Sequence, residues 1–223
     1  KIIIPAFAVG RTQLLVYYLR ELEDEGRIPV LPVAVDSPMG VDVTRLYSRH
    51  HEDHDFDMKR IVNLRRNPLA TRNFSLVQGR AGSKGLDAQK GSAIIISASG
   101  MATGGRVLHH LTHYLPDPAS AVILVGYQAV GTRGRRLQDR EKEVKIHGQW
   151  IPVAAQIESI SSLSAHADSG EILRWLKGFK RPPRATFIVH GEQGSTRALH
   201  EKIVEQLGWN AVIPTHTEVV ELA

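Results

Sequence analysis

The amino-acid sequence predicts an α/β fold with a mainly parallel sheet flanked by helices. Short apolar runs, such as Ile94-Ile95-Ile96, alternate along the chain with longer segments of helical periodicity. Uninterrupted apolar runs are typical of strands that are buried on both faces, as in parallel sheets. Because parallel strands need a crossover connection, this alternation of strands and helices predicts βαβ units.

The first half of the chain supplies most of these units. A helix is expected from about residue 10 to residue 25, where leucine and tyrosine side chains recur at the spacing of one helical face. Residues 41–66 are expected to be mostly helical. Residues 82–85 are expected to form a loop that leads into a short helix from about residue 84 to residue 89, and residues 106–115 to form another helix. The predicted strands in this half are 2–4, 30–35, 74–77, 93–98 and 121–125.

The pattern changes after Asp139. Two short strand segments that flank Gly148 predict a β-hairpin. Asp168 is the expected N-cap of a helix, because a carboxylate at that position accepts hydrogen bonds from free helix amides. Further strands are expected at 155–160, 185–189, 211–213 and 217–220, with a helix that ends near Leu207. We therefore predict a domain boundary near residue 135.

The composition excludes several classes of protein. The chain has 223 residues, of which 42% are hydrophobic and 23% charged, so a disordered tail, a collagen-like fibre and a coiled coil are excluded. It has no cysteine, which excludes a disulfide scaffold and thiolate zinc sites. No apolar run approaches the roughly 20 residues that cross a bilayer. We therefore expect a cytoplasmic protein with no membrane partner.

Positive charge is concentrated in one stretch of the chain. The net charge is +5, yet the segment from Lys59 to Lys90 alone carries +7, with Asp87 as its one acidic residue. Such a stretch is typical of proteins that bind a polyanion such as nucleic acid. Arg65 and Arg66 are the candidates for phosphate contacts. A solvated arginine-rich face is the alternative interpretation.

A glycine-rich segment follows the strand predicted at 93–98 and leads into a helix. Glycines allow backbone amides to approach an anion, and a helix N-terminus adds partial positive charge. The segment lacks the Gly-Lys-Ser/Thr of a Walker loop and the glycine spacing of the dinucleotide fingerprint. Glycine packing in a tight βα turn is the alternative. The candidate phosphate-binding residues are Ser99, Gly100, Gly104, Gly105 and Arg106.

Histidines stand where α/β proteins often bind ligands. His166 precedes an expected helix, and His190 directly follows an apolar strand segment. Ligands collect at the carboxyl ends of the strands in open α/β sheets, so both residues are candidates for metal or phosphate binding. A capping or hydrogen-bonding role is the alternative. Residues 50–57 also place histidines and acids four residues apart, which either a metal site or a polar turn between helices would explain.

Six segments of the chain, in order, resemble the β-CASP nucleases of the metallo-β-lactamase superfamily. That family includes the endonuclease subunit of the pre-mRNA cleavage and polyadenylation factor, its archaeal and bacterial relatives and, more distantly, ribonuclease J. The segments extend over nearly the whole chain. They are IPAFAVGRTQ (4–13), DSPM (36–39), SASGMATGGR (97–106), GYQAVGT (126–132), SAHAD (164–168) and VHGE (189–192).

The resemblance implies two domains, a zinc centre and several site residues. Residues 1–135 would form the RNA-gripping β-CASP domain, and residues 136–223 the C-terminal part of the αββα metallo-β-lactamase fold. His190 matches a ligand of the second of two zinc ions. His166 matches the histidine that assists leaving-group protonation at the scissile phosphate, with Ser164 as a phosphate contact. On the same grounds, Ser37 of the DSPM segment is a further substrate-binding residue.

The family's other zinc ligands do not occur in this sequence. Most of them come from an upstream His-x-His-x-Asp-His motif, which the 223 residues lack. We expect the chain to be the C-terminal part of a zinc-dependent ribonuclease that hydrolyses RNA phosphodiester bonds, and to be inactive in isolation. Its expected partners are RNA, the absent N-terminal half and a second copy in a homodimer. A non-catalytic nucleic-acid-binding module and an unrelated α/β phosphate-binding domain are the alternatives.

Overall fold

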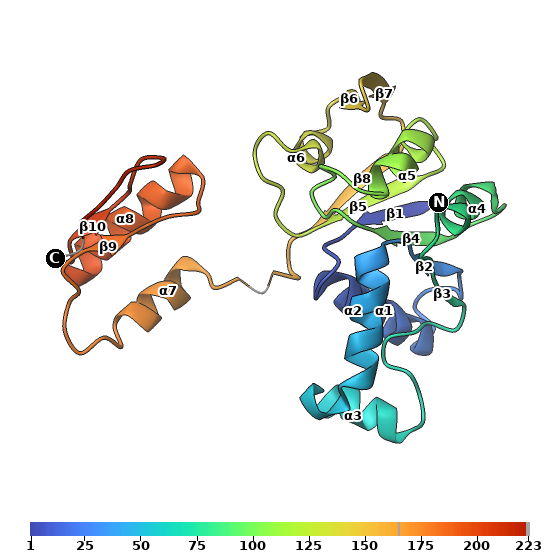
Figure 1. Ribbon diagram of the computed structural model, residues 1–223, viewed down its shortest axis with the longest axis horizontal. Coiled ribbons are helices and arrows are strands. Elements are labelled where there is room, and N and C mark those ends of the chain that lie inside the picture. The colour runs from blue at the N-terminus through green and yellow to red at the C-terminus, as the bar shows by residue number, and fades with distance from the viewer. Residues whose placement is uncertain (165, 222–223) are drawn as a thin grey trace. The chain divides into compact units, whose positions relative to one another are not determined.

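The computed structural model describes residues 1–164 and 166–221 of the chain (Figure 1). The chain divides into two compact units, which we call the first unit (Lys1–Ser164) and the second unit (Ala165–Ala223). None of the helices in the described residues has the length and apolar character needed to cross a membrane.

The first unit is built on a six-stranded sheet in which every pairing is parallel. The strand order is β3-β2-β4-β1-β5-β8, so most neighbours in the sheet are not neighbours in the chain. This sheet confirms the predicted α/β class. The strands are β1 (Ile2–Pro5), β2 (Val33–Val35), β3 (Phe74–Leu76), β4 (Ile94–Ser97), β5 (Ala121–Val125) and β8 (Gln156–Ile160).

Both faces of this sheet are covered. Ile95 contributes to one buried cluster, together with the helix that follows the glycine-rich loop, whereas Ile94 and Ile96 contribute to the cluster on the other face. Successive strand side chains point to opposite faces, which explains why the strands are apolar at every position. Figure 1 shows α1 and α2 on one side of the sheet and α5 on the other. The helices are α1 (Arg11–Asp24), α2 (Pro38–Arg49), η1 (His51–Asp53), α3 (Phe56–Asn63), α4 (Arg80–Ala88), α5 (Val107–Tyr114) and α6 (Arg133–Gln138).

The predicted hairpin is confirmed as an antiparallel pair, β6 (Glu143–Ile146) and β7 (Gln149–Pro152). His147 and Gly148 form its two-residue turn with φ values of 47° and 84°. Two positive φ values in succession match the right-handed twist of the flanking strands, and glycine adopts them without strain. The buried side chains of this hairpin join the same core cluster as α5.

The second unit is small and has its own core. Its elements are α7 (Ser169–Leu176), β9 (Thr186–Phe187), α8 (Gln193–Leu207) and β10 (Ala211–Val212), and β9 pairs with β10 in parallel. Leu173, Ile188 and Ile203 are buried between the helices and the strands. Asp168 is the N-cap of α7, as predicted, because its carboxylate accepts a hydrogen bond from the backbone N–H of Glu171.

Two local predictions were wrong. Residues 82–85 lie inside α4 rather than in a loop, because the side chain of Ser83 is anchored by the carboxylate of Asp36 and this contact outweighs the low helix propensity of glycine. Residues 217–220 form no strand, because Thr217 lies in a turn with φ of 66°. The domain boundary near residue 135 stays a prediction; the sheet of the first unit extends to β8, beyond that residue.

Candidate functional site

A buried charge network lies at the carboxyl end of β2, and Asp36 is at its centre. The side chain of Asp36 is fully buried. One of its oxygens accepts a hydrogen bond from Arg106 at 2.6 Å. The other lies 2.7 Å from Nε2 of His110 and accepts from the hydroxyl of Ser83. The network therefore connects β2 with α4 and with both the start and the middle of α5.

The network keeps Asp36 charged in spite of its burial. Burial alone would raise the pKa of this carboxyl, but hydrogen bonds from His110, Ser83 and Arg106 outweigh burial and hold the pKa below its ordinary value. On its other side, Nδ1 of His110 lies 3.1 Å from a carboxylate oxygen of Asp87. The His110 ring therefore bridges the carboxylates of Asp36 and Asp87.

Arg106 was predicted to bind phosphate, and the structure gives its guanidinium three partners within the first unit. Besides Asp36, it donates to the backbone carbonyls of Val77 and Gln78, which follow β3. These bonds fix the end of the glycine-rich loop against β2 and β3. Ser37 lies beside this network and caps α2, with its hydroxyl accepting from the N–H of Gly40 at 3.1 Å. Phosphate binding by Arg106 and Ser37 stays a prediction.

The glycine-rich loop is held by its own hydrogen bonds. The hydroxyl of Ser99 accepts from the backbone N–H groups of Thr103 and Gly104, at 3.1 and 3.3 Å. Gly105 has a φ of 80°, and a Cβ atom there would lie 2.4 Å from the carbonyl oxygen of Ala98. A Cβ atom on the buried Gly100 would lie 3.0 Å from the backbone nitrogen of Phe7. These two glycines therefore permit close approach of backbone segments, which was the alternative to a phosphate cradle.

The basic stretch is distributed over α3, the following loop, β3 and α4. Part of its charge is balanced, because the guanidinium of Arg66 lies 2.5 Å and that of Arg72 lies 3.9 Å from a carboxylate oxygen of Asp24 at the end of α1. Arg65 is exposed and has a φ of 56°. RNA contacts by Arg65 and Arg66 stay predictions.

The two candidate histidines are exposed in the second unit. His166 lies two residues before the N-cap of α7, and His190 lies between β9 and α8 with a φ of 63°. Ser164 is exposed at the end of the first unit. Within residues 1–164 and 166–221, the one group of three potential metal ligands close together is the exposed set His50, Glu52 and Asp53. The described residues therefore do not complete a zinc site around His190.

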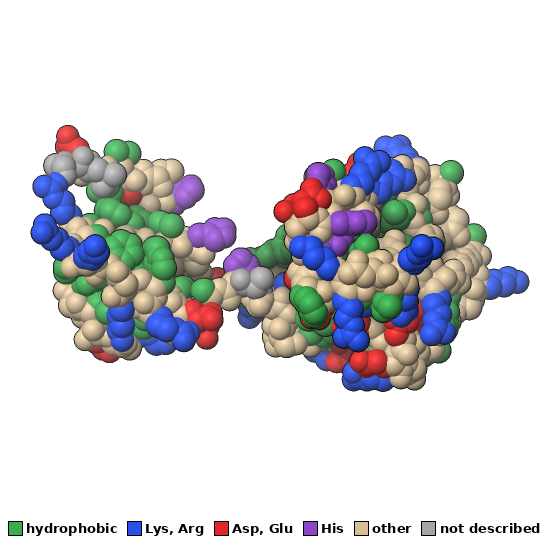
Figure 2. All heavy atoms as spheres, turned by 90° about the horizontal axis from the view of Figure 1, so that it is seen from below, with side chains coloured by type: hydrophobic (Ala, Val, Ile, Leu, Met, Phe, Trp, Pro, Cys, Tyr) green, Lys and Arg blue, Asp and Glu red, His purple; other side chains and the backbone are tan. Residues whose placement is uncertain are grey.

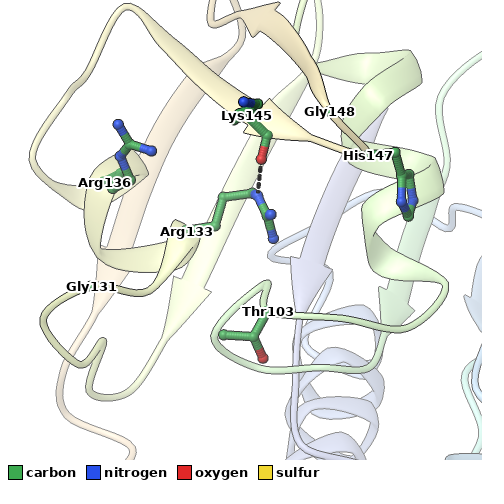
Figure 3. A pocket seen from close by; sticks show the side chains of 7 residues that line it. All are labelled: Thr103, Gly131, Arg133, Arg136, Lys145, His147 and Gly148. Atoms are coloured by element: carbon green, nitrogen blue, oxygen red, sulfur yellow. Dashed lines mark hydrogen bonds between the residues drawn. The ribbon is translucent and has the colours of Figure 1, made fainter.

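A basic pocket beside the glycine-rich loop was not anticipated from the sequence. It has a volume of about 420 Å³. Figure 3 shows that its basic side chains come from α6 (Arg133 and Arg136) and from the β6–β7 hairpin (Lys145 and His147), with Thr103 of the glycine-rich loop opposite them. The alternation of polar and apolar residues along the hairpin was the signal that could have indicated an exposed basic face.

Comparison with known proteins agrees with the fold. Residues 12–137 match the family model of the Beta-Casp domain, and residues 150–214 match that of the Zn-dependent metallo-hydrolase RNA specificity domain. The chain is 36% identical to a ribonuclease of Thermus thermophilus over 89% of its own length and 45% of that protein. It is 28% identical to transcription termination factor FttA of Methanosarcina mazei, over 99% of its own length and 35% of that protein.

A third relative is an RNase J-like protein of Methanocaldococcus jannaschii, which is 29% identical over the whole of this chain and 50% of that protein. The chain thus spans between about a third and a half of the length of these relatives. The Beta-Casp match alone covers more than half of the 223 residues, in the unit that contains the parallel sheet. The chain therefore belongs to the β-CASP family of the metallo-β-lactamase superfamily.

Proposed function

We propose that this chain is the C-terminal part of a zinc-dependent ribonuclease that hydrolyses phosphodiester bonds of RNA. The observation that carries the proposal is the order of the two family matches, Beta-Casp and then the metallo-hydrolase RNA specificity domain, along one chain. Two exposed histidines, His166 and His190, follow the first match and lie within the second. A relative named as a ribonuclease supports the same reaction class.

In this proposal His190 is one ligand of a zinc ion. A stable catalytic zinc site needs about three protein ligands, and among the described residues no group of three potential ligands includes His190. The donor set of this chain therefore does not fit a complete site. The remaining ligands belong to residues outside this sequence, so we expect the 223-residue chain alone to bind zinc weakly and to be inactive.

His166 has a separate role in the proposal. An imidazole placed opposite the attacking group can donate the proton that a departing ribose oxygen requires. The N-terminus of α7 already holds an anion, because the carboxylate of Asp168 caps the helix. The hydrogen bond from the backbone of Glu171 outweighs the opposing effect of burial and, with a weaker one from Gly170, lowers the pKa of this carboxyl. The proposal therefore assigns a phosphate contact to the hydroxyl of Ser164 rather than to those amides.

The second unit has exposed aromatic and aliphatic side chains that the proposal uses. Trp175 is 67% exposed and its ring centroid lies 5.3 Å from that of Phe179, while Val189 is 65% exposed. Figure 2 shows apolar side chains gathered over part of this unit. Exposed apolar patches are typical of interaction surfaces. We propose that the absent N-terminal half packs here, and that without it the chain self-associates.

The proposal is tested by metal analysis and RNA cleavage. In the protein that includes the upstream ligands, His190→Ala should abolish cleavage and lower the zinc content, whereas His166→Ala should slow cleavage with zinc retained. His216→Ala, at another exposed histidine of the second unit, is the matched control and should leave both unchanged. Stoichiometric zinc and cleavage by the dialysed 223-residue chain would contradict the ligand count. Tight RNA binding without cleavage by the longer protein would favour a non-catalytic module.

A further inference from the structure

The outer face of the β6–β7 hairpin combines an aromatic ring with positive charge. Along β6, Val144 and Ile146 are buried while Lys145 between them is exposed. Trp150 of β7 lies directly opposite Lys145 in the antiparallel register, and its side chain is 51% exposed. The alternation of strand side chains thus anchors one face of the hairpin in the core and presents Lys145 and Trp150 on the other.

Cations surround this indole without covering it. The guanidinium carbon of Arg136 lies 5.6 Å and the ammonium nitrogen of Lys145 lies 6.0 Å from the ring centroid of Trp150. Both residues also line the basic pocket. The exposed indole therefore lies beside two of the residues that line the pocket.

The basic pocket carries an excess of positive charge. None of the described residues that line it is acidic. Glu141 does not line the pocket, but one of its carboxylate oxygens lies 2.9 Å from Nε of Arg136 and balances the charge of that guanidinium. Arg133 donates to the carbonyls of Lys145 and Ala102, so it acts as a fixed charge. Burial, and then the neighbouring charge of Arg136, lower the pKa of Arg133, as expected where cations are crowded together.

We propose that this hairpin surface, comprising Trp150, Arg136, Lys145 and the basic pocket, binds single-stranded RNA. A backbone phosphate occupies the basic pocket, and a neighbouring base stacks on the indole of Trp150. The inference rests on the proposed function and deepens it, because it takes RNA as the substrate class and assigns it a contact within the first unit. It identifies a positioning surface and not a catalytic one.

The exposed indole and the adjacent cations favour single-stranded RNA over other polyanions. Stacking needs the open face of a base, which a duplex keeps covered by its neighbouring base pairs, whereas single-stranded segments expose it. An acidic peptide would satisfy the cations but would give the indole no planar partner. The combination of an exposed aromatic ring with adjacent cations is the arrangement that single-strand-binding proteins use.

The test compares RNA affinity among variants of the full chain. Binding of a fluorescein-labelled twelve-nucleotide single-stranded RNA is measured by anisotropy at several salt concentrations, beside an abasic strand of the same length. Trp150→Ala should weaken RNA binding about tenfold and leave abasic-strand binding unchanged, while Trp150→Phe retains the affinity within about threefold. Lys145→Gln should lower the affinity and reduce the salt slope by about one unit. Arg27→Gln, at an exposed arginine of the first unit paired with Glu25, is the control and should have no effect.

Specific outcomes would overturn the inference. RNA affinity unchanged in both Trp150→Ala and Lys145→Gln would exclude this surface as an RNA site. Equal losses for the RNA and the abasic strand in Trp150→Ala would exclude stacking, and full competition by polyglutamate would indicate a general cationic patch. Failure here is distinguishable from failure of the proposed function, because the zinc content of the longer protein depends on His190 and not on Trp150, and it is measured without RNA. Circular dichroism of each variant is the control that checks whether the hairpin substitutions leave the fold intact.

Discussion

Replacing Asp36 by Asn should destabilise the first unit by about 3 kcal/mol, because breaking one partner of a buried ion pair typically costs 3–5 kcal/mol. The side chains of Asp36 and His110 are both fully buried, so Asp36 cannot exchange its protein partners for water. The side chain of Arg106 is 21% exposed, which reduces its share of the loss. The amide can still accept one hydrogen bond, so the estimate lies at the lower end of the range.

The assay must report on the first unit alone. Hydrogen exchange of the peptide that contains β4, measured by mass spectrometry through a urea titration, meets this need because β4 lies in the centre of the sheet. Glu25→Gln is the matched control, since Glu25 is 56% exposed in its pair with Arg27 and such surface pairs contribute about 0–1 kcal/mol. If Asp36→Asn changes the free energy of unfolding no more than this control does, the network does not stabilise the fold as we argue.

Two further predictions concern pH and the glycine-rich loop. The pKa of Asp36 lies below its ordinary value of 3.8 in the folded protein, so its stabilising effect is present above that value and is lost as the pH falls through the lowered pKa. The free energy of unfolding, measured in urea between about pH 5 and about pH 2, should therefore fall more steeply in the wild type than in Asp36→Asn; equal slopes would argue against a charged Asp36. Gly105→Ala should destabilise the first unit by about 1–3 kcal/mol, because its backbone has a positive φ and a Cβ would meet the carbonyl of Ala98. Gly104→Ala, where a Cβ would meet no atom within 4 Å, should change the free energy of unfolding by less than about 0.5 kcal/mol. Equal effects of the two substitutions on this free energy would refute the steric account of Gly105.

The sequence alone determined the class of fold and the succession of its main elements. Runs such as Ile94-Ile95-Ile96 are local, and their burial on both faces follows from the period of two along a strand. The hairpin around Gly148 and the N-cap at Asp168 were predictable for the same reason, because their signals lie within a few residues. The family was also readable from short motifs in order along the chain.

The tertiary structure alone decided which charged side chains meet. Asp36 and His110 are 74 residues apart, and no local spacing indicates that they form a buried pair. The basic pocket likewise combines Thr103 with α6 and the β6–β7 hairpin, which are separate segments of the chain. Hydrophobic periodicity is a property of neighbouring residues, whereas the energy of a charge depends on its burial and on its distance to partners that only the folded chain brings together.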